Sequence, residues 1–259
     1  PPYGEIDDEP CGPSKPQRDF HQLARRHRYA FFLGGLGSGK TWAGAVHTVR
    51  NILANRAMLQ AMGRRHVELL HLVSAPQWAD LEHPWRHLTT ILDQAHDENG
   101  LSLIAGKPRK GQRLWEIRLI TGDVIHCFPS DPQNYKGANA SSFWHDEIEE
   151  AVNPHASFKL CNARLREKRS PMLWGILTST PADLGQGMAE HFQDLIAASN
   201  PNYCMVRSHT SQNPAYADGE YAANNAETMS ERERRVKLGG EILPPDGSVY
   251  GFEVRPDGD

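Results

Sequence analysis

The chain has 259 residues, of which 39% are hydrophobic and 23% charged, and its formal net charge is −4. This composition is typical of a globular protein with a sizeable core, and no apolar run approaches the ~20 residues of a membrane span. The N-terminus lacks a signal-peptide pattern, and the four cysteines (Cys11, Cys127, Cys161 and Cys204) are too widely spaced to indicate a disulfide framework. We therefore expect reduced thiols, a cytosolic setting and no membrane partner.

The first half of the chain alternates predicted helices and strands. Residues 1–16, rich in proline and acidic residues, predict an extended lead-in, and residues 16–29 a helix. An apolar strand over 29–33 precedes a glycine-rich loop and a helix over 40–62, in which apolar residues recur at helical spacing. Residues 66–74 predict a buried strand, and residues 76–95 a helix in which Pro84 marks a break or a new first turn. Two strands, 114–120 and 123–128, follow around a tight turn at Thr121–Gly122.

The second half continues the alternation. Strands are predicted over 141–147, 171–181 and 203–210, helices over 155–167 and 187–199, and helical pieces over 213–252. This order predicts an α/β fold with a mainly parallel sheet flanked by helices on both faces. Ligands of such sheets bind beyond the carboxyl ends of the strands. We expect a lead-in over 1–16, a core over 17–210 and a smaller C-terminal region over 211–259.

The glycine-rich loop lies in "FFLGGLGSGKTWAGA", residues 31–45, and fits the pattern G-x-x-x-x-G-K-[ST]. Glycines let successive backbone N–H groups point at one anion, and the following helix adds its positive end. Lys40 would reach the β- and γ-phosphates of ATP, and the Thr41 hydroxyl would ligate Mg²⁺. The predicted nucleotide-binding residues are Gly34, Gly35, Leu36, Gly37, Ser38, Gly39, Lys40 and Thr41.

Two further motifs follow predicted strands. "SSFWHDEIEE" supplies Asp146, expected to hold Mg²⁺, and Glu147, expected to orient and deprotonate the attacking water. Adjacent acids are also common where a helix starts, so this alternative stays open. "ILTSTP" ends in hydroxyls at Thr178, Ser179 and Thr180 that could hydrogen-bond the attacking water; a simple turn stopped by Pro181 explains them equally well.

Together these motifs resemble the large terminase subunit of tailed bacteriophages, the motor that packs DNA into procapsids. The resemblance runs from about Gln17 to Phe252, and the run "ITGDVIHCFPSDPQNYKGANASSFWHDE", followed by "LTSTPADLGQGMAEHF", is more specific than the phosphate loop alone. It implies a P-loop NTPase of the ASCE (RecA-like) type, with an extra strand between phosphate loop and acidic pair. It also implies double-stranded DNA, a homo-oligomeric ring, a portal protein, a small terminase subunit and a procapsid as partners, in the host cell cytoplasm.

The resemblance assigns further roles. Gln17 is similar to the glutamine that contacts adenine, although it would otherwise be an ordinary first-turn helix residue. Thr178 to Pro181 resemble the motif that couples hydrolysis to movement, with Thr178 at the nucleotide and Thr180 in catalysis. Residues from about Asn213 to Gly240 resemble a lid or linker, and "DGSVYGFEV" resembles the start of a nuclease domain. We therefore expect ATP hydrolysis without DNA cleavage from these 259 residues.

Two departures from the family pattern concern charge at the phosphates. Many members carry arginine where this chain has Leu36, and an arginine before the acidic pair, a candidate finger for a neighbour's site, is replaced by Lys136. Lysine offers a point charge where arginine offers a planar fork. The alternatives are Arg164 and Arg166, then Arg109 and Arg113, although Arg164 could equally be the structural partner of an acid.

Two rival functions use the same phosphate loop. A helicase-like or recombination ATPase would need a second RecA-like domain or separate helicase motifs, and neither is evident in the sequence. A small-molecule kinase or nucleotide switch would need an acceptor pocket and lid arginines, and the acidic pair followed by "TSTP" argues against it.

Overall fold

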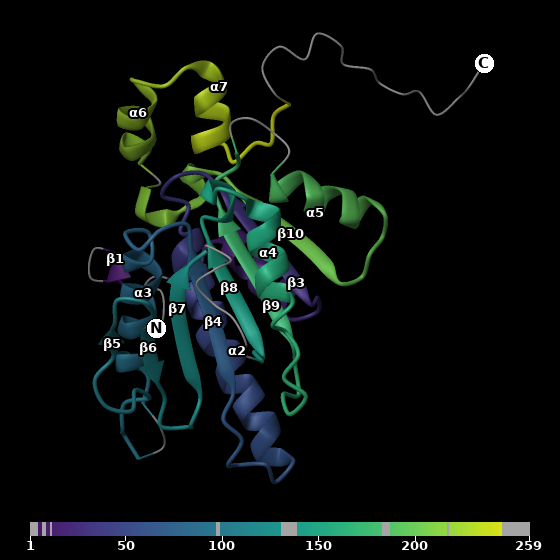
Figure 1. Ribbon diagram of the computed structural model, residues 1–259. Helices are drawn as coiled ribbons and strands as arrows, with labels where there is room; N and C mark the ends of the chain where they lie inside the picture. Colours follow the sequence, from purple (N-terminus) through teal and green to yellow (C-terminus); the bar gives the residue numbers. More distant parts are fainter. Residues whose placement is uncertain are drawn as a thin grey trace, which may run out of the picture.

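The computed structural model describes residues 5–6, 9–10, 12–96, 99–130, 139–182, 187–216 and 218–244. Its centre is an eight-stranded sheet of order β10-β3-β9-β8-β4-β7-β6-β5 (Figure 1). The strands are β3 (Tyr29–Gly34), β4 (Leu70–Ala75), β5 (Arg109–Lys110), β6 (Trp115–Arg118), β7 (Val124–Pro129), β8 (Ser142–Asp146), β9 (Trp174–Ser179) and β10 (Tyr203–Ser208). In the lead-in, β1 (Glu5–Ile6) and β2 (Glu9–Pro10) pair with each other as a small antiparallel ribbon.

The direction of the strands decides what meets at each edge. The strands from β10 to β7 are parallel, whereas β6 and β5 run antiparallel to their neighbours. The carboxyl ends of the parallel strands therefore share one edge of the sheet. Strand β9 lies between β3, which leads into the glycine-rich loop, and β8, which carries the acidic pair. This is the extra strand of the predicted ASCE type, and the prediction is confirmed.

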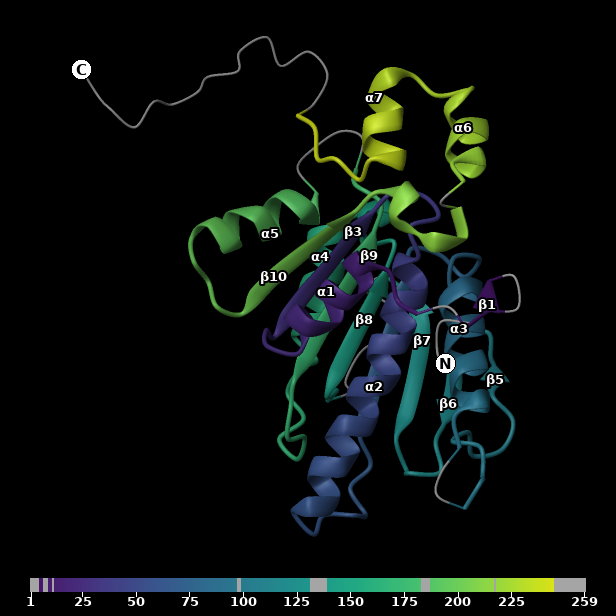
Figure 2. The ribbon, with the colours of Figure 1, turned by 180° about the vertical axis from the view of Figure 1, so that it is seen from behind.

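Helices cover both faces of the sheet, as predicted. Figure 2 shows α1 (Lys15–Ala24) and α2 (Lys40–Ala61) on one face, and α3 (Glu82–Gln94) packs against α2. Helices α4 (Pro154–Asn162) and α5 (Met188–Ala197) lie on the other face in Figure 1, and each face has its own apolar core. Within the described residues, no helix is long and apolar enough to cross a bilayer.

Short helices follow the last strand and lie above the carboxyl edge of the sheet, at the top of Figure 1. We call residues 209–240 the lid segment. It contains η2 (Thr210–Gln212), η3 (Pro214–Tyr216), α6 (Glu220–Ala226), α7 (Glu231–Glu233) and η4 (Arg234–Leu238). A further 3-10 turn, η1 (Ile148–Glu150), directly follows the acidic pair.

Three predicted helices are markedly shorter in the structure. The helix expected over 76–95 begins only at Glu82, so Pro84 lies in its first turn and does not break it. The helix expected over 16–29 begins one residue earlier, because Ser14 and Gln17 form a capping box, and ends at Ala24. The helix expected over 155–167 ends at Asn162. Its continuation is not helical because Leu165 forms a parallel bridge with Ala140, which draws the chain back to the sheet.

A buried ion pair fastens α2 to the edge of β7. Arg56 donates to both carboxylate oxygens of Asp123, from Nη2 at 2.6 Å and from Nε at 3.0 Å. The two side chains are 4% and 0% exposed. Thr121 Oγ1 donates to the same carboxylate at 2.7 Å, and His71 Nε2 lies 3.7 Å from it. Burial opposes ionisation of Asp123, but the nearby His71 and the hydrogen bonds from Arg56 and Thr121 outweigh burial and lower its pKa.

Removing this charge should destabilise the fold. We expect Asp123→Asn to cost about 3 kcal/mol of unfolding free energy at pH 7, because the Arg56 guanidinium stays buried without its counter-charge. The lowered pKa makes this contribution fully present above the unfolded value of ~3.9 and lost as the pH falls through the folded value. Urea titrations at pH 7 and pH 3 measure both effects. Asp93→Asn, at an exposed position on α3, is the control; equal losses in the two variants would contradict the assignment.

Candidate active site

The glycine-rich loop joins β3 to α2 at the carboxyl edge of the sheet. Gly37 and Gly39 have φ of 71° and 80°, in the left-handed region that favours glycine. The first helical hydrogen bond of α2 runs from Ala43 N–H to the Gly39 carbonyl at 3.0 Å. The N–H groups of Lys40 and Thr41 precede this bond, so they are available to an anion, as expected at a helix N-terminus.

The carbonyl groups of the loop are held from outside by side chains of two other segments. Two of these side chains come from the lid segment and one from α1. The three contacts are Thr210 Oγ1 to the Leu36 carbonyl at 2.7 Å, Asn213 Nδ2 to the Gly37 carbonyl at 2.6 Å and Gln17 Nε2 to the Gly39 carbonyl at 3.1 Å. Because these carbonyls are occupied, the loop conformation is set before any ligand arrives.

Gln17 also closes the first turn of α1. Its Oε1 accepts a hydrogen bond from the Ser14 N–H at 2.8 Å, so both ends of its amide have partners within the protein. The side chain is buried against Gly39 and thereby adjoins the phosphate loop. Its contact with adenine stays a prediction, because in this arrangement a base would have to displace one of these partners.

The acidic pair lies opposite the loop. Asp146 is the last residue of β8, and Glu147 follows with φ 48° and ψ 47°, an uncommon conformation for a residue with a side chain. Lys40 Nζ is 3.0 Å from Glu147 Oε1, and Thr41 Oγ1 donates to Asp146 Oδ1 at 3.2 Å. The two motifs, more than a hundred residues apart in sequence, therefore meet in one site.

The predicted coupling motif contacts both acids. Thr178 Oγ1 donates to Asp146 Oδ1 at 2.5 Å and accepts from Trp144 Nε1 at 2.7 Å. Ser179 Oγ and the Thr180 N–H approach Glu147 Oε2 at 3.3 and 3.2 Å. These contacts follow from the pairing of β8 with β9, in which Asp146 is the partner of Thr178.

Two carboxyl groups at or beside the site, Asp146 and Glu149, have raised pKa values because they are buried. Burial, followed by the charge of Glu147, raises the pKa of Asp146 to about 7, although Thr178 and Lys40 oppose the rise. Burial also raises the pKa of Glu149 to about 7. Glu149 accepts hydrogen bonds from Met188 and Ala189 N–H, at 3.0 and 2.7 Å, at the start of α5. Glu149 is therefore a helix-start acid for α5, whereas Glu147 is the N-cap residue of η1 but forms no side-chain cap hydrogen bond there.

The candidate arginines do not join this site in their own subunit. The Arg164 carbonyl accepts from Ala140 N–H at 2.7 Å, and Arg166 Nε donates to Asn139 at 2.7 Å. Both contacts lie where the chain enters β8, at the amino edge, whereas Asp146 ends that strand. Their role as fingers, in a neighbour's site, stays a prediction. Lys136 lies outside the described residues.

The remaining alternatives, Arg109 and Arg113, are exposed on and beside β5, the strand at the far edge of the sheet. Several strands separate β5 from the acidic pair on β8. Arg109 and Arg113 therefore do not contribute charge to the site of their own subunit either.

Sequence reasoning missed several residues that build the site. Trp144 supports Thr178, and a β-carbon on Gly44 of α2 would lie 2.6 Å from its ring, so α2 packs closely on it. Thr210 and Asn213 follow β10, whose carboxyl end lies beside that of β3. The rule that parallel strands share a carboxyl edge could have found Thr210 and Asn213, once the position of β10 was known.

The residues present fit a triphosphate with Mg²⁺. Ser38 Oγ is buried in the loop and has no hydrogen-bond partner within the part of the chain that the structure describes. Asp146 and Thr41 place a buried carboxylate beside a hydroxyl. Mg²⁺ at phosphate-binding sites is usually held by one or two protein ligands of this kind, and substrate phosphates supply further ligands.

The ligand-free site should be strained by its own charge. An unfolded aspartate ionises near pH ~3.9, whereas Asp146 ionises near pH 7, so the folded state loses stability as the pH rises through this interval. We expect Asp146→Asn to raise the melting temperature of the ligand-free protein by several degrees at pH 8 but not at pH 4. Differential scanning calorimetry at both pH values measures the effect. A variant less stable than wild type at pH 8 would contradict it, and Asp123→Asn is the control of opposite sign.

Comparisons with known proteins agree with this geometry. Among solved structures, a variant of the large terminase ATPase domain of Thermus phage P74-26 has a TM-score of 0.56 and 16% identity, and the match covers 90% of this chain and 95% of that one. The bacteriophage HK97 large terminase gives 0.62 and 15%, but the match covers only 51% of its length and 90% of this chain. These likenesses establish the fold.

The family is established by sequence. No curated protein sequence gives a significant match. A family model described as terminase large subunit, T4likevirus-type, N-terminal matches residues 31–253. This range includes the phosphate loop from Phe31 onward, the acidic pair and the whole lid segment. Because the match covers most of the chain, the protein belongs to the family of terminase large subunits of T4likevirus type and carries the N-terminal region that the family model describes.

Proposed function

We propose that this chain is the ATP-hydrolysing domain of a viral packaging motor that moves double-stranded DNA into a procapsid. The observation that carries the proposal is the meeting of Lys40 with Glu147 at 3.0 Å, beside the contact of Thr41 with Asp146 at 3.2 Å. Phosphate-binding and water-activating groups are thus within reach of one substrate. Family membership and the named ATPase domain of the Thermus phage terminase support the same activity.

Each residue of the site has a chemical role in this proposal. The loop N–H groups and Lys40 bind the β- and γ-phosphates, and Thr41 and Asp146 hold Mg²⁺. Bound Mg²⁺ neutralises charge on the phosphate oxygens. Glu147 accepts a proton from a water that attacks the γ-phosphorus, and the bond to the bridging oxygen breaks to release ADP and phosphate. Ser179 and Thr180 orient Glu147 through their contacts with its second oxygen.

The ion pair between Lys40 and Glu147 describes the protein before substrate binds. Both side chains are largely buried, at 7% and 21% exposed, so each charge needs a partner. A triphosphate supplies that partner to Lys40. Glu147 is then released toward water, held by the hydroxyl and backbone of the coupling motif. Nucleotide binding and activation of the base are therefore the same event, in which Lys40 exchanges Glu147 for the triphosphate.

The lid segment is hydrogen-bonded to the phosphate loop, so a change at the loop on nucleotide binding can move the lid segment. Its Lys237 carbonyl accepts from the Leu36 N–H at 2.6 Å, and Thr210 bridges the carbonyls of Leu36 and Leu238 at 2.7 and 3.0 Å. We propose residues 17–210 as the ATPase core and 211–259 as the lid or linker toward a nuclease domain, so the boundary falls within η2, directly after Thr210. The portal protein, the small terminase subunit, the procapsid and the host cytoplasm belong to the same proposal, on the support of the family alone.

Replacing the proposed base tests the chemistry. We expect Glu147→Gln to lower ATP turnover by about 10²–10⁴-fold, because a carboxamide cannot accept the proton. Binding of a fluorescent ATP analogue should persist, since Lys40 then lacks a competing carboxylate. Release of free phosphate, measured against formation of any phosphorylated acceptor, also distinguishes hydrolysis from a kinase.

The matched control is Glu150→Gln, which removes the same charge from an exposed acid three positions on. It should keep turnover within a few-fold of wild type. Comparable loss in both variants, or full activity in Glu147→Gln, would remove Glu147 from the role of base.

A finger supplied by a neighbouring subunit predicts complementation. An arginine of this kind contributes about 10³–10⁵ in rate where it is known. We expect DNA-stimulated hydrolysis to rise steeply with protein concentration, and to be lost in Lys136→Ala or Arg164→Ala if that residue is the finger. Mixing such a variant with Glu147→Ala should restore part of the activity, because one interface in the mixture is intact. Turnover strictly proportional to concentration, without rescue on mixing, would place catalysis within one subunit.

A further inference from the structure

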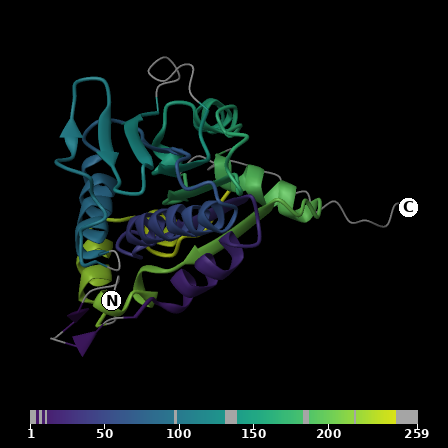
Figure 3. The same ribbon diagram turned by 90° about the horizontal axis from the view of Figure 1, so that it is seen from below.

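The amino edge of the sheet, opposite the candidate active site, is strongly basic. Strands β3, β9, β8 and β4 are adjacent and parallel, so the segments that enter them lie side by side; Figure 3 looks onto this edge. We call residues 25–28, 62–69 and 163–173 the amino-edge rim. It has two acids, Glu68 and Glu167, although the whole chain carries a net charge of −4. Its arginines and lysines are Arg25, Arg26, Arg28, Arg64, Arg65, Arg164, Arg166, Lys168 and Arg169.

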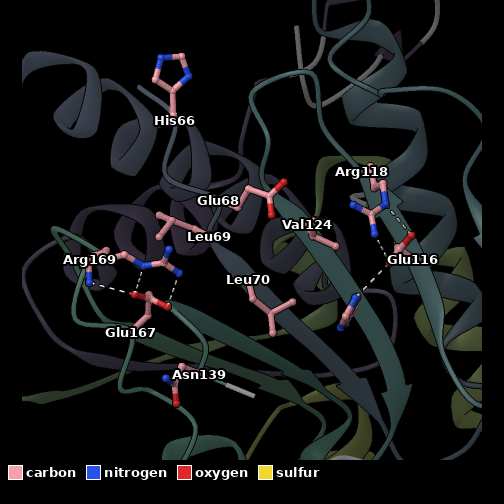
Figure 4. Close-up of a pocket in the computed structure, with 11 residues that line it drawn as sticks. His66, Glu68, Leu69, Leu70, Glu116, Arg118, Val124, Asn139, Glu167 and Arg169 are labelled. Atoms are coloured by element: carbon pink, nitrogen blue, oxygen red, sulfur yellow. Dashed lines mark hydrogen bonds and ion pairs between the residues drawn. The ribbon is translucent and has the colours of Figure 1, made fainter. Parts of the chain in front are cut away.

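One pocket at this edge, which we call the balanced pocket because both of its arginines are paired, is lined by three glutamates and two arginines. Its volume is about 550 Å³, and it lies where β4, β6 and β7 meet the rim (Figure 4). Each arginine that lines it faces a glutamate: Arg169 Nε is 2.8 Å from Glu167, and Arg118 Nε is 2.9 Å from Glu116. An anion entering this pocket would have to compete with carboxylates already in place.

A second pocket at the same edge has no acidic lining residue. It has a volume of about 490 Å³ and lies between the end of α1, the middle of α2 and the start of β9. Arg25, Arg26 and Arg28 line it and are exposed, and among the described residues no carboxylate forms an ion pair with them. Its other walls are His27, Asn51 and apolar side chains, including Trp174.

The charge of this acid-free pocket does not depend on pH in the neutral range. Behind it lie His21 and His47, whose Nδ1 atoms are 3.2 Å apart. Burial, then the charge of Arg50, lowers the pKa of His21 to about 4, so this pair carries no charge at pH 7. Burial and, among nearby cations, Arg25 also lower the pKa of His47. The positive potential therefore comes from guanidinium groups, which stay protonated.

We propose that the acid-free pocket, together with the exposed Arg64 and Arg65 of the rim, binds the phosphate backbone of double-stranded DNA. The proposal rests on the proposed packaging function and assigns a DNA-facing surface to it. Guanidinium groups match phosphate oxygens in geometry as well as in charge. From β3 to β4 the rim crosses three strand spacings of ~4.8 Å, or ~14 Å, which is close to the ~12 Å width of a major groove. Its basic segments can thus face phosphates on both sides of one groove.

The composition of the rim favours a duplex over a single strand. Proteins that bind single strands stack the bases on aromatic side chains. The amino-edge rim contains no phenylalanine, tyrosine or tryptophan, and Trp174, the aromatic wall of the acid-free pocket, is only 4% exposed. The surface therefore offers charge without an open stacking platform. Contacts made only to phosphates carry no base information, so the binding should be independent of sequence and sensitive to salt.

The test compares two double variants that remove the same charge. The 259-residue protein is titrated against fluorescent 30-bp duplexes of two unrelated sequences, between 50 and 300 mM KCl. We expect Arg25→Gln with Arg26→Gln to weaken binding of both duplexes about tenfold or more at 100 mM KCl. The slope of log K against log[KCl] should become shallower by about two. The control, Arg118→Gln with Arg169→Gln in the balanced pocket, should change affinity by less than about threefold.

Several outcomes would overturn the assignment. Equal weakening by both double variants would indicate a net-charge effect, and no weakening, or no duplex binding by wild type at 50 mM KCl, would exclude this surface. Loss of binding to a poly-glutamate peptide but not to DNA would assign the pocket to an acidic protein, and a preference for a single strand would likewise contradict a duplex site. Basal ATP turnover without DNA should match wild type in both variants; if wild type itself lacks turnover, the proposed function fails independently of this result.

Discussion

The site depends on the adjacency of three parallel strands, β3, β9 and β8. Because their carboxyl ends share an edge, Asp146 receives hydrogen bonds from Thr41 on one side and Thr178 on the other, at 3.2 and 2.5 Å. One carboxylate thereby joins the start of α2 to two strands that come much later in the chain. A change in the ionisation or ligation of Asp146 therefore alters hydrogen bonds to α2 and to the coupling motif on β9 at the same time.

The parts of this site that depend on residues close together in sequence could be predicted. The parts that depend on which strands pair in the sheet could not. The phosphate loop around Lys40 and the acidic pair at Asp146 and Glu147 are each formed by residues that are close together in sequence. The sequence therefore predicts these two motifs, and it also predicts the alternation of helices and strands. The order of strands in the sheet is not local. Nothing in the sequence indicates that the backbone of Arg164 lies at the opposite edge of the sheet from the acids, where it pairs with Ala140. Asn213 reaches the loop only because β10 pairs with β3.

Two buried aspartates show how the same side chain can support stability or oppose it. Asp123 is held by Arg56, Thr121 and His71, and its lowered pKa records a net gain from ionisation. Asp146 is buried beside another acid, and its raised pKa records a cost. The first arrangement strengthens the fold, whereas the second keeps a carboxyl group ready for a cation at the expense of the ligand-free protein.

Helix α2 connects the two ends of the molecule. Its 22 residues span about 33 Å at 1.5 Å per residue. It begins at the lysine of the phosphate loop and ends just before Arg64 and Arg65 of the rim. Apart from its side-chain contacts to the sheet, it is a single continuous rod. A tilt of a few degrees at its nucleotide end displaces its far end by a couple of ångströms, so the helix can act as a lever arm between the two edges of the sheet.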